Sequence, residues 1–136
     1  MGTRSRIGIQ LENGVIESIY CNFDGYPSYN GNILLTYYKD RNKVQQLIDL
    51  GDISSLGPEI GEKQDFNNPS DDWTLVYGRD RGERGTQKTI NTDGVVGFFG
   101  NDCGEEYFYL FTKDNKWLVS NSSEELVPLE GHEELK

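Results

Sequence analysis

The stretch SRIGIQLENGVIESIYC, residues 5–21, decides the fold. Its first half alternates apolar side chains at positions 7, 9 and 11 with Gly8 and Gln10, which is the period of a half-buried strand. Asn13-Gly14 follows, a pair typical of a two-residue hairpin turn because both residues tolerate a left-handed backbone. The run over 15–20 then returns with β-branched and aromatic residues. These residues predict a β-hairpin over 5–21.

Two helical stripes follow a loop rich in Gly, Pro and Asn at residues 22–31. The first stripe has apolar residues at positions 33, 34, 37 and 38, and the second has them at 44, 47, 48 and 50. Asp40 is placed to cap the second helix, and Gly51 to end it in a left-handed conformation. We therefore expect two short helices, followed by an irregular stretch over 52–72.

The second half of the chain contains further strand signals. Residues 73–77 are β-branched and aromatic, and they lead into a charged segment, 78–85, expected at a strand end or in a loop. A Gly-rich passage over 95–104 precedes a second predicted hairpin, residues 106–112 and 116–120. The sequence thus predicts one α+β domain over 1–120, with an antiparallel sheet of about five strands, made of two β-hairpins plus one strand. Two short helices would pack on one face of this sheet.

The closing residues, 121–136, hold five Glu against one Lys, which is typical of a solvated, flexible, acidic tail. The whole chain is also acidic, because 23 Asp and Glu outnumber 13 Lys and Arg and give a formal charge of −10. Such a charge disfavours nucleic-acid and anionic-membrane partners and favours a basic protein surface. The other interpretation is that the negative charge only keeps the protein soluble. The charge by itself therefore does not show whether the protein binds a partner.

Several classes of enzyme are excluded by composition. The one histidine, His132, lies in the acidic tail, which leaves no member for a Ser-His-Asp triad or a histidine-based metal site. The chain has no phosphate-binding P-loop and no dinucleotide fingerprint. Neighbouring acids such as Asp71-Asp72 and Glu105-Glu106 are expected by chance among 23. We expect no catalytic residues, no metal and no cofactor.

Cysteine usage and the N-terminal residues favour the cytoplasm. Cys21 and Cys103 lie far apart in the chain and lack the spacing of a zinc site. The sequence does not show whether the two thiols are close enough in the fold to form a disulfide. The first residues are polar and basic with no apolar run behind them, so we expect neither a signal peptide nor a membrane span.

Arginine is unevenly distributed, because five of the six arginines fall in two short stretches. The first stretch holds Arg4 and Arg6, on the strand face opposite Ile7, so both are expected to leave the core together. The second holds Arg79, Arg81 and Arg84. If the stretches are neighbours, their guanidinium groups would bind an anion such as a phosphate or a nucleotide. Alternatively, Arg79 and Arg81 form structural salt bridges with Asp80, Glu83, Asp24 or Asp52.

Aromatic residues gather in the loop over 22–31, where Phe23, Tyr26 and Tyr29 surround the acidic Asp24. Tyrosines in a Gly- and Pro-rich loop often anchor protein interfaces, which makes Asp24 and Tyr26 candidates for partner binding. The other interpretation folds the aromatic rings over the hairpin as part of the core. A domain of this size needs apolar area, which favours the core interpretation.

Four segments also carry a resemblance to a known group of proteins: TRSRIGI (3–9), SIYCNFDGYP (18–27), LIDLGDISSLG (47–57) and YGRDRGE (77–83). Together with EYFYLF (106–111) and KW (116–117), they resemble an uncharacterised family of small accessory proteins encoded by tailed bacteriophages. The resemblance covers most of residues 3–119. It implies a phage protein that acts in the host cytoplasm, and it implies no particular activity or catalytic residue.

These observations lead to two hypotheses of different classes. The first is a non-enzymatic phage accessory protein that counters or redirects a bacterial defence system by stoichiometric binding to a host protein, aided by its acidic surface. The alternative is a small-molecule binder that sequesters a nucleotide or cyclic-nucleotide signal through the clustered arginines. Self-association stays open under both.

Overall fold

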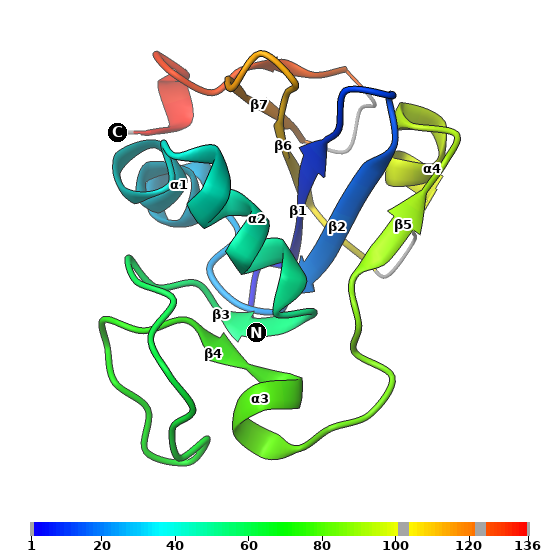
Figure 1. Cartoon of the computed structure of the whole chain (residues 1–136). Helices are drawn as coiled ribbons and strands as arrows, with labels where there is room; N and C mark the ends of the chain where they lie inside the picture. The colour runs from blue at the N-terminus through cyan, green and yellow to red at the C-terminus, as the bar shows by residue number, and fades with distance from the viewer. Residues whose placement is uncertain (1, 101–103, 122–124, 136) are drawn as a thin grey trace.

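A computed structural model describes residues 2–100, 104–121 and 125–135 of the chain. One mixed sheet runs through the molecule in the strand order β4-β3-β2-β1-β6-β7-β8, and β5 also pairs with β2 (Figure 1). The strands are β1 Ser5–Gln10, β2 Ile16–Cys21, β3 Ile53–Ser55, β4 Leu75–Val76, β5 Thr89–Asn91, β6 Tyr107–Phe111, β7 Trp117–Ser120 and β8 Val127–Pro128. The helices are η1 Pro27–Gly31, α1 Asn32–Tyr37, α2 Arg41–Asp49, α3 Tyr77–Arg81, α4 Val95–Gly100 and η2 Glu133–Leu135.

The α+β class is confirmed, but the expectation of an antiparallel sheet of about five strands is wrong. β1 pairs in parallel with β6, from Ser5 opposite Tyr107 to Ile9 opposite Phe111. β2 pairs in parallel with β3 at Cys21 and Ile53. Both parallel pairs join strands that are separated by long connections, as parallel pairing requires. Residue patterns within one strand do not reveal such distant partners.

The first hairpin forms as predicted, but its turn does not. Leu11 donates its N–H to the carbonyl of Val15 at 2.8 Å, which leaves a three-residue loop over 12–14. Gly14 has φ of 87°, whereas Asn13 keeps a negative φ and accepts a hydrogen bond from the Val15 N–H through its side chain at 3.1 Å. A three-residue loop needs only one left-handed residue, so the Asn side chain caps the turn instead of adopting that conformation.

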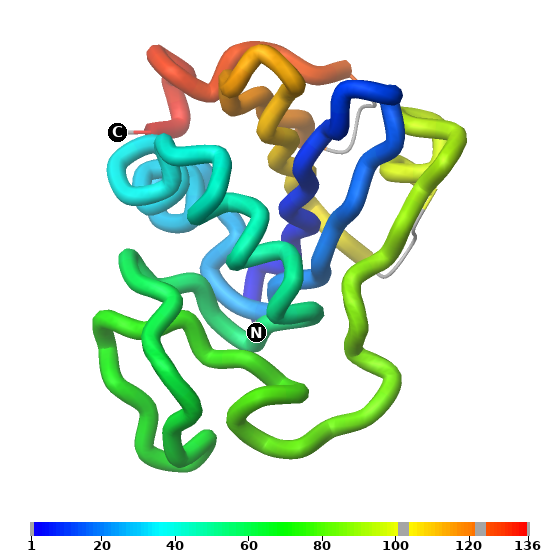
Figure 2. The backbone as a smooth tube through the Cα atoms, in the orientation of Figure 1, coloured from blue at the N-terminus to red at the C-terminus, as the bar shows by residue number. Residues whose placement is uncertain are grey.

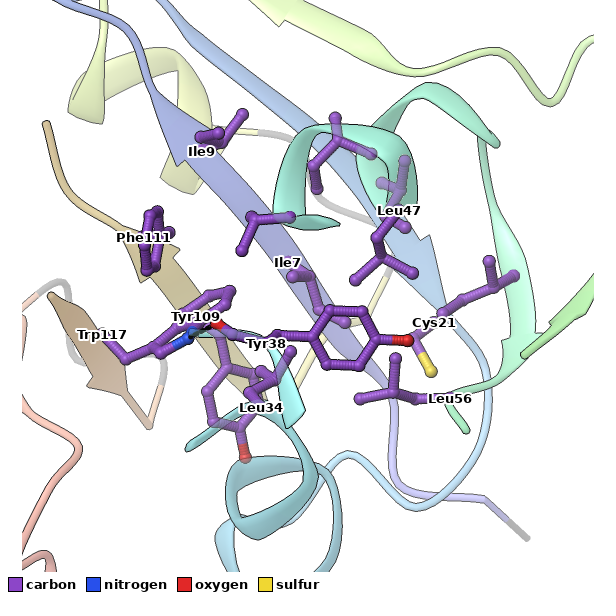
Figure 3. Close-up of a cluster of buried hydrophobic side chains, with 14 of the residues drawn as sticks. Ile7, Ile9, Cys21, Leu34, Tyr38, Leu47, Leu56, Tyr109, Phe111 and Trp117 are labelled. Carbon is purple, nitrogen blue, oxygen red and sulfur yellow. Dashed lines mark hydrogen bonds between the residues drawn. The ribbon is translucent and has the colours of Figure 1, made fainter. Parts of the chain in front are cut away.

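The two predicted helices, α1 and α2, pack on one face of the sheet. Asp40 caps α2 by accepting a hydrogen bond from the Asn42 N–H, and Gly51 follows the helix with φ of 86°, as expected. Between these helices and the sheet lies the main core (Figure 3). The core residues labelled there are Ile7, Ile9, Cys21, Leu34, Tyr38, Leu47, Leu56, Tyr109, Phe111 and Trp117.

The opposite face of the sheet is covered as well, which corrects the expectation that helices pack on one face only. The Gly-rich passage begins as helix α4, and its Phe98 is fully buried against Gly8 of β1. A Cβ atom at Gly8 would lie 2.8 Å from the Phe98 ring, so α4 can pack this close to β1 only because Gly8 has no side chain. A second, smaller hydrophobic cluster forms here from Ile16, Phe98, Phe108 and Leu110.

The connection between β3 and β4 contains the longest irregular segment. Figure 2 shows this segment, coloured green, as a broad loop beside the β3–β4 end of the sheet. The strand predicted over 73–77 shrinks to the two residues of β4, and the charged segment after it begins as helix α3. Gly82 ends α3 with φ of 69°.

Residues 125–135 are packed against the domain, within the stretch 121–136 that was expected to be a flexible acidic tail. β8 pairs with β7, Leu129 is fully buried, and the Asn32 side chain donates to the Leu135 carbonyl at 2.8 Å. Charge counting missed the apolar residues within this segment, which bring it back to the core.

Two further expectations concern the cysteines and the membrane. Cys21 is a free, buried thiol whose pKa burial raises to about 11, and Cys103 lies outside the described residues. Across the part of the chain that the structure describes, no helix has the length and apolar character needed to span a membrane.

Candidate functional site

Arg6 is 3% exposed, so it does not leave the core as expected. Its Nε donates to Glu105 Oε2 at 2.6 Å, and its Nη1 donates to Ser18 Oγ at 3.1 Å. Arg6 does lie on the strand face opposite Ile7, but α4 and the segment before β6 cover that face. The expectation failed because it assumed that only one face of the sheet is buried.

Arg79 and Arg81 also form contacts within the protein. Arg79 donates to its neighbour Asp80 at 2.8 Å and to the carbonyls of Ile60 and Thr74, each at 2.8 Å. Asp80 in turn accepts the backbone N–H of Val76 at 2.8 Å. Burial alone would raise the pKa of Asp80, but these hydrogen bonds outweigh it and hold the pKa below its usual value. Together the pair ties α3 to the long β3–β4 connection.

Arg81 lies against two aromatic rings and a carboxylate. Its guanidinium carbon is 4.5 Å from the centroid of the Phe66 ring and 4.9 Å from that of Tyr77. Its Nη2 donates to Glu83 Oε2 at 2.5 Å. Arg81 and Arg84 are both exposed. The structural salt-bridge interpretation therefore describes Arg79 and Arg81, with Asp80 and Glu83 as their partners.

Arg4 borders a hollow of about 440 Å³ near the start of β1. The hollow is lined by Gly2, Arg4, Asn22, Gly104 and Glu106. A carboxylate in the lining weakens the attraction for a phosphate or nucleotide. The arginines of the two stretches thus have different surroundings. Three of them, Arg6, Arg79 and Arg81, pair with acids, and Arg81 also stacks on aromatic rings. Arg84 lies at the surface, and Arg4 lies beside the hollow.

The aromatic loop differs from the favoured expectation, because its rings do not pack in the core. Phe23, Tyr26 and Tyr29 are 42%, 37% and 42% exposed. The Tyr26 and Tyr29 ring centroids lie 6.2 Å apart, with an angle of 57° between the rings. Large apolar area is therefore presented to solvent in one short segment.

The backbone of this loop is nevertheless held at nearly every residue. Asn22 and Phe23 extend the pairing with β3, by donating to the carbonyls of Ile53 at 3.2 Å and Ser54 at 3.0 Å. On the other side, the buried Asn30 donates its N–H to the Asp24 carbonyl at 3.2 Å and its side-chain amide to the Phe23 carbonyl.

Gly25 is the tightest point of the loop. Its N–H donates to the Thr3 carbonyl at 2.8 Å, and its carbonyl accepts the buried Tyr109 hydroxyl at 2.6 Å. A Cβ atom at this position would lie 2.6 Å from the Ser5 side chain. The preceding Asp24 has φ of 58°, a conformation that surrounding contacts must hold in place. The loop is thus fixed against β1 and β6.

Two carboxylates accompany the exposed tyrosines. The Tyr26 hydroxyl lies 3.4 Å from Asp24 Oδ1. Partial burial raises the pKa of Tyr29, and the negative charges of Asp24 and Asp71 raise it further, so both charges act on the Tyr29 hydroxyl. Within the described residues, neither Asp24 nor Asp71 forms an ion pair. We call Phe23, Asp24, Tyr26, Tyr29 and Asp71 the tyrosine–carboxylate surface.

This surface suits binding better than catalysis. Partial burial, and after it the nearby negative charge, raises the pKa of Tyr29 and keeps its proton on, so this hydroxyl can donate a hydrogen bond, while both tyrosines offer ring faces. Among the described residues, no group of three or more His, Cys, Asp and Glu is placed to hold a metal ion. The arrangement can take up apolar and cationic groups of another molecule.

Sequence reasoning named Asp24 and Tyr26 as candidates but gave Asp71 no role in binding. Asp71 lies 42 residues beyond Tyr29 in a stretch without periodicity, so only the folded chain brings its charge to act on Tyr29.

No protein-family model, curated protein or solved structure matches this chain.

Proposed function

We propose that this protein is a non-enzymatic binding module that docks on a basic region of a partner protein through the tyrosine–carboxylate surface. The observation that carries the proposal is the contrast between side chains and backbone: three aromatic rings are exposed on a loop whose backbone is hydrogen-bonded along its length. A loop that existed only to fill the core would bury those rings.

Pre-organisation explains why such a loop binds well. Association costs free energy for each segment that becomes ordered, and a loop already fixed by Thr3, Asn30 and Tyr109 avoids most of that cost. Tyrosine is also over-represented among the residues that dominate interface energetics, since it combines a large apolar ring with one hydrogen-bonding group.

The charge of the chain supports a basic partner. A formal charge of −10 creates a field that draws positively charged surfaces and speeds their encounter. The resemblance to phage accessory proteins supplies the setting: the partner would be a bacterial host protein, for example a component of a defence system, and the encounter would occur in the host cytoplasm.

The alternative of a nucleotide binder has less support. Arg6, Arg79 and Arg81 already contact carboxylates of the same chain. An anion would have to compete with those carboxylates for their guanidinium groups.

A capture experiment with matched variants tests the proposal. The full chain is immobilised and exposed to bacterial lysate at low and at physiological salt, beside the double variant Tyr26→Ser/Tyr29→Ser. The control is Tyr37→Ser, an exposed tyrosine of α1 outside the surface. We expect a captured protein that, once purified, binds the wild-type chain stoichiometrically.

The double variant should weaken the affinity for that purified protein by roughly 30-fold, the equivalent of about 2 kcal/mol. The control should bind as the wild type does, and all three chains should melt at similar temperatures. Stoichiometric binding that is equal in wild type and double variant would overturn the proposal, as would the absence of any stoichiometric partner at both salt concentrations.

A further inference from the structure

The composition of the tyrosine–carboxylate surface points to one kind of partner side chain. Two aromatic rings, Tyr26 and Tyr29, lie next to each other, and the Tyr26 hydroxyl lies 3.4 Å from the carboxylate of Asp24. The charge of Asp71 also acts on Tyr29, and among the described residues neither acid forms an ion pair. We propose that this surface accepts an arginine side chain of the partner protein, which rests on the docking role proposed above.

The same protein already contains an occupied example of this arrangement. Arg81 lies over Phe66 and Tyr77, whose ring centroids are 5.7 Å apart, and it pairs with the carboxylate of Glu83. The Tyr26 and Tyr29 centroids are 6.2 Å apart and also have carboxylates beside them. The two sites therefore share their components, and the surface site differs in having no cation from the described residues.

An arginine fits this surface better than a lysine does. A guanidinium is flat, so it stacks on a ring while its edge directs N–H groups to a carboxylate. The tilt of 57° between the Tyr26 and Tyr29 rings lets the group lie flat on one ring with the second ring flanking it. A lysine ammonium is compact and strongly hydrated, and it loses more on leaving water.

The charges of the two acids add a reason for cation binding. Asp24 and Asp71 both disfavour negative charge at the Tyr29 hydroxyl, after the larger effect of partial burial. A guanidinium resting on the Tyr29 ring would be attracted by both carboxylates. The benefit is electrostatic, so added salt should weaken it.

The test uses three acetylated hexapeptides that differ at one central position, which is arginine, lysine or citrulline. Citrulline keeps the planar shape of arginine and lacks its charge. Each peptide is titrated into the full chain while NMR signals of residues 23–29 and 71 are followed. We expect saturable shifts with the arginine peptide and an affinity for the citrulline peptide that is lower by about tenfold. The lysine peptide should lie between them.

Charge-neutral variants locate the site. Asp24→Asn removes one negative charge and keeps a residue type that tolerates the left-handed backbone. Asp71→Asn removes the other negative charge. Each should weaken arginine-peptide binding by about threefold, whereas Asp114→Asn, on the exposed β6–β7 turn, should not change it.

Equal binding of the three peptides, no binding of the arginine peptide, or no effect of either aspartate variant would overturn the arginine proposal. These outcomes are separable from failure of the docking role. If the captured protein still requires Tyr26 and Tyr29 while the peptides bind equally, docking stands and the arginine proposal fails. If capture does not depend on the tyrosines, docking itself fails.

Discussion

Arg6 and Glu105 form an ion pair that is almost fully removed from water, with side chains 4% and 1% exposed. Burying two charges is costly, and the opposite charges offset part of that cost by compensating each other at 2.6 Å. Ser18 occupies one further guanidinium nitrogen. The pair therefore fixes the position of the segment before β6 relative to β1, which makes it a structural element and not an anion-binding site.

Removing one charge of this pair should be strongly destabilising. We expect Glu105→Gln to lower the free energy of unfolding by about 3–5 kcal/mol, because the buried Arg6 would lose the carboxylate charge that lies 2.6 Å from its Nε. The neighbouring variant Glu106→Gln, at an exposed position, should change it by less than about 0.5 kcal/mol. Urea denaturation followed by circular dichroism measures both values. A small effect of Glu105→Gln would mean that water reaches the pair.

At the scale of elements, two turns use glycine for the same backbone conformation in different surroundings. Gly14 in the β1–β2 loop and Gly51 after α2 have φ of 87° and 86°. A Cβ atom at Gly14 would have open space around it, whereas one at Gly51 would lie 2.3 Å from the Thr86 carbonyl oxygen. A side chain at Gly14 would cost only the free energy of a left-handed backbone. A side chain at Gly51 would add the cost of a steric clash to it.

Alanine at each position tests that separation. Gly14→Ala should cost about 1–2 kcal/mol of unfolding free energy, the penalty for a left-handed alanine. Gly51→Ala should cost clearly more, because the chain near Thr86 must also move and its hydrogen bond with Asp52 would weaken. Thermal unfolding of both variants gives the comparison, and equal losses would contradict it.

The elements that could be predicted are those whose signals are local. The alternation over 5–11, the helical spacing before Gly51 and the cap at Asp40 each involve residues close in sequence, and each is present in the structure. The parallel pairing of β1 with β6 could not be predicted, since nothing within either strand specifies a partner far along the chain.

The candidate site was only partly predictable for the same reason. The conformation of the loop that carries Tyr26 depends on hydrogen bonds to Thr3 and Tyr109, which come from distant parts of the chain, as well as on Asn30 within the loop. Arg6 is buried against Glu105, which lies 99 residues further along the chain, so the sequence around Arg6 does not reveal its burial. Residue types suggested candidates, whereas the exposure of those candidates could be read only from the complete fold.

For the whole molecule, the closing segment decides how large the cooperative unit is. Leu129 is fully buried and joins the main core, although it lies in the most acidic part of the chain. Its N–H donates to the carbonyl of Trp117 at 3.0 Å. Residues 125–135 should therefore unfold together with the sheet.

Two adjacent substitutions check this. Leu129→Ala should lower the free energy of unfolding by about 2–5 kcal/mol through lost burial and the resulting cavity. Glu130→Ala, at the next and exposed position, should leave it within about 0.5 kcal/mol. A single unfolding transition, shifted in the first variant only, is the expected result of differential scanning calorimetry. An unchanged midpoint for Leu129→Ala would show that the segment is dispensable.

The central position of β1 has a consequence for synthesis on the ribosome. β2 follows β1 at once, but β6, its other neighbour, follows only after residues 11–106. At translation rates of about 5–20 residues per second, the second edge of β1 waits roughly 5–20 s for its partner. During that interval an apolar strand edge is open to the nascent chains of neighbouring ribosomes. The abundant acidic residues, by keeping such chains apart, would protect the protein before it is complete.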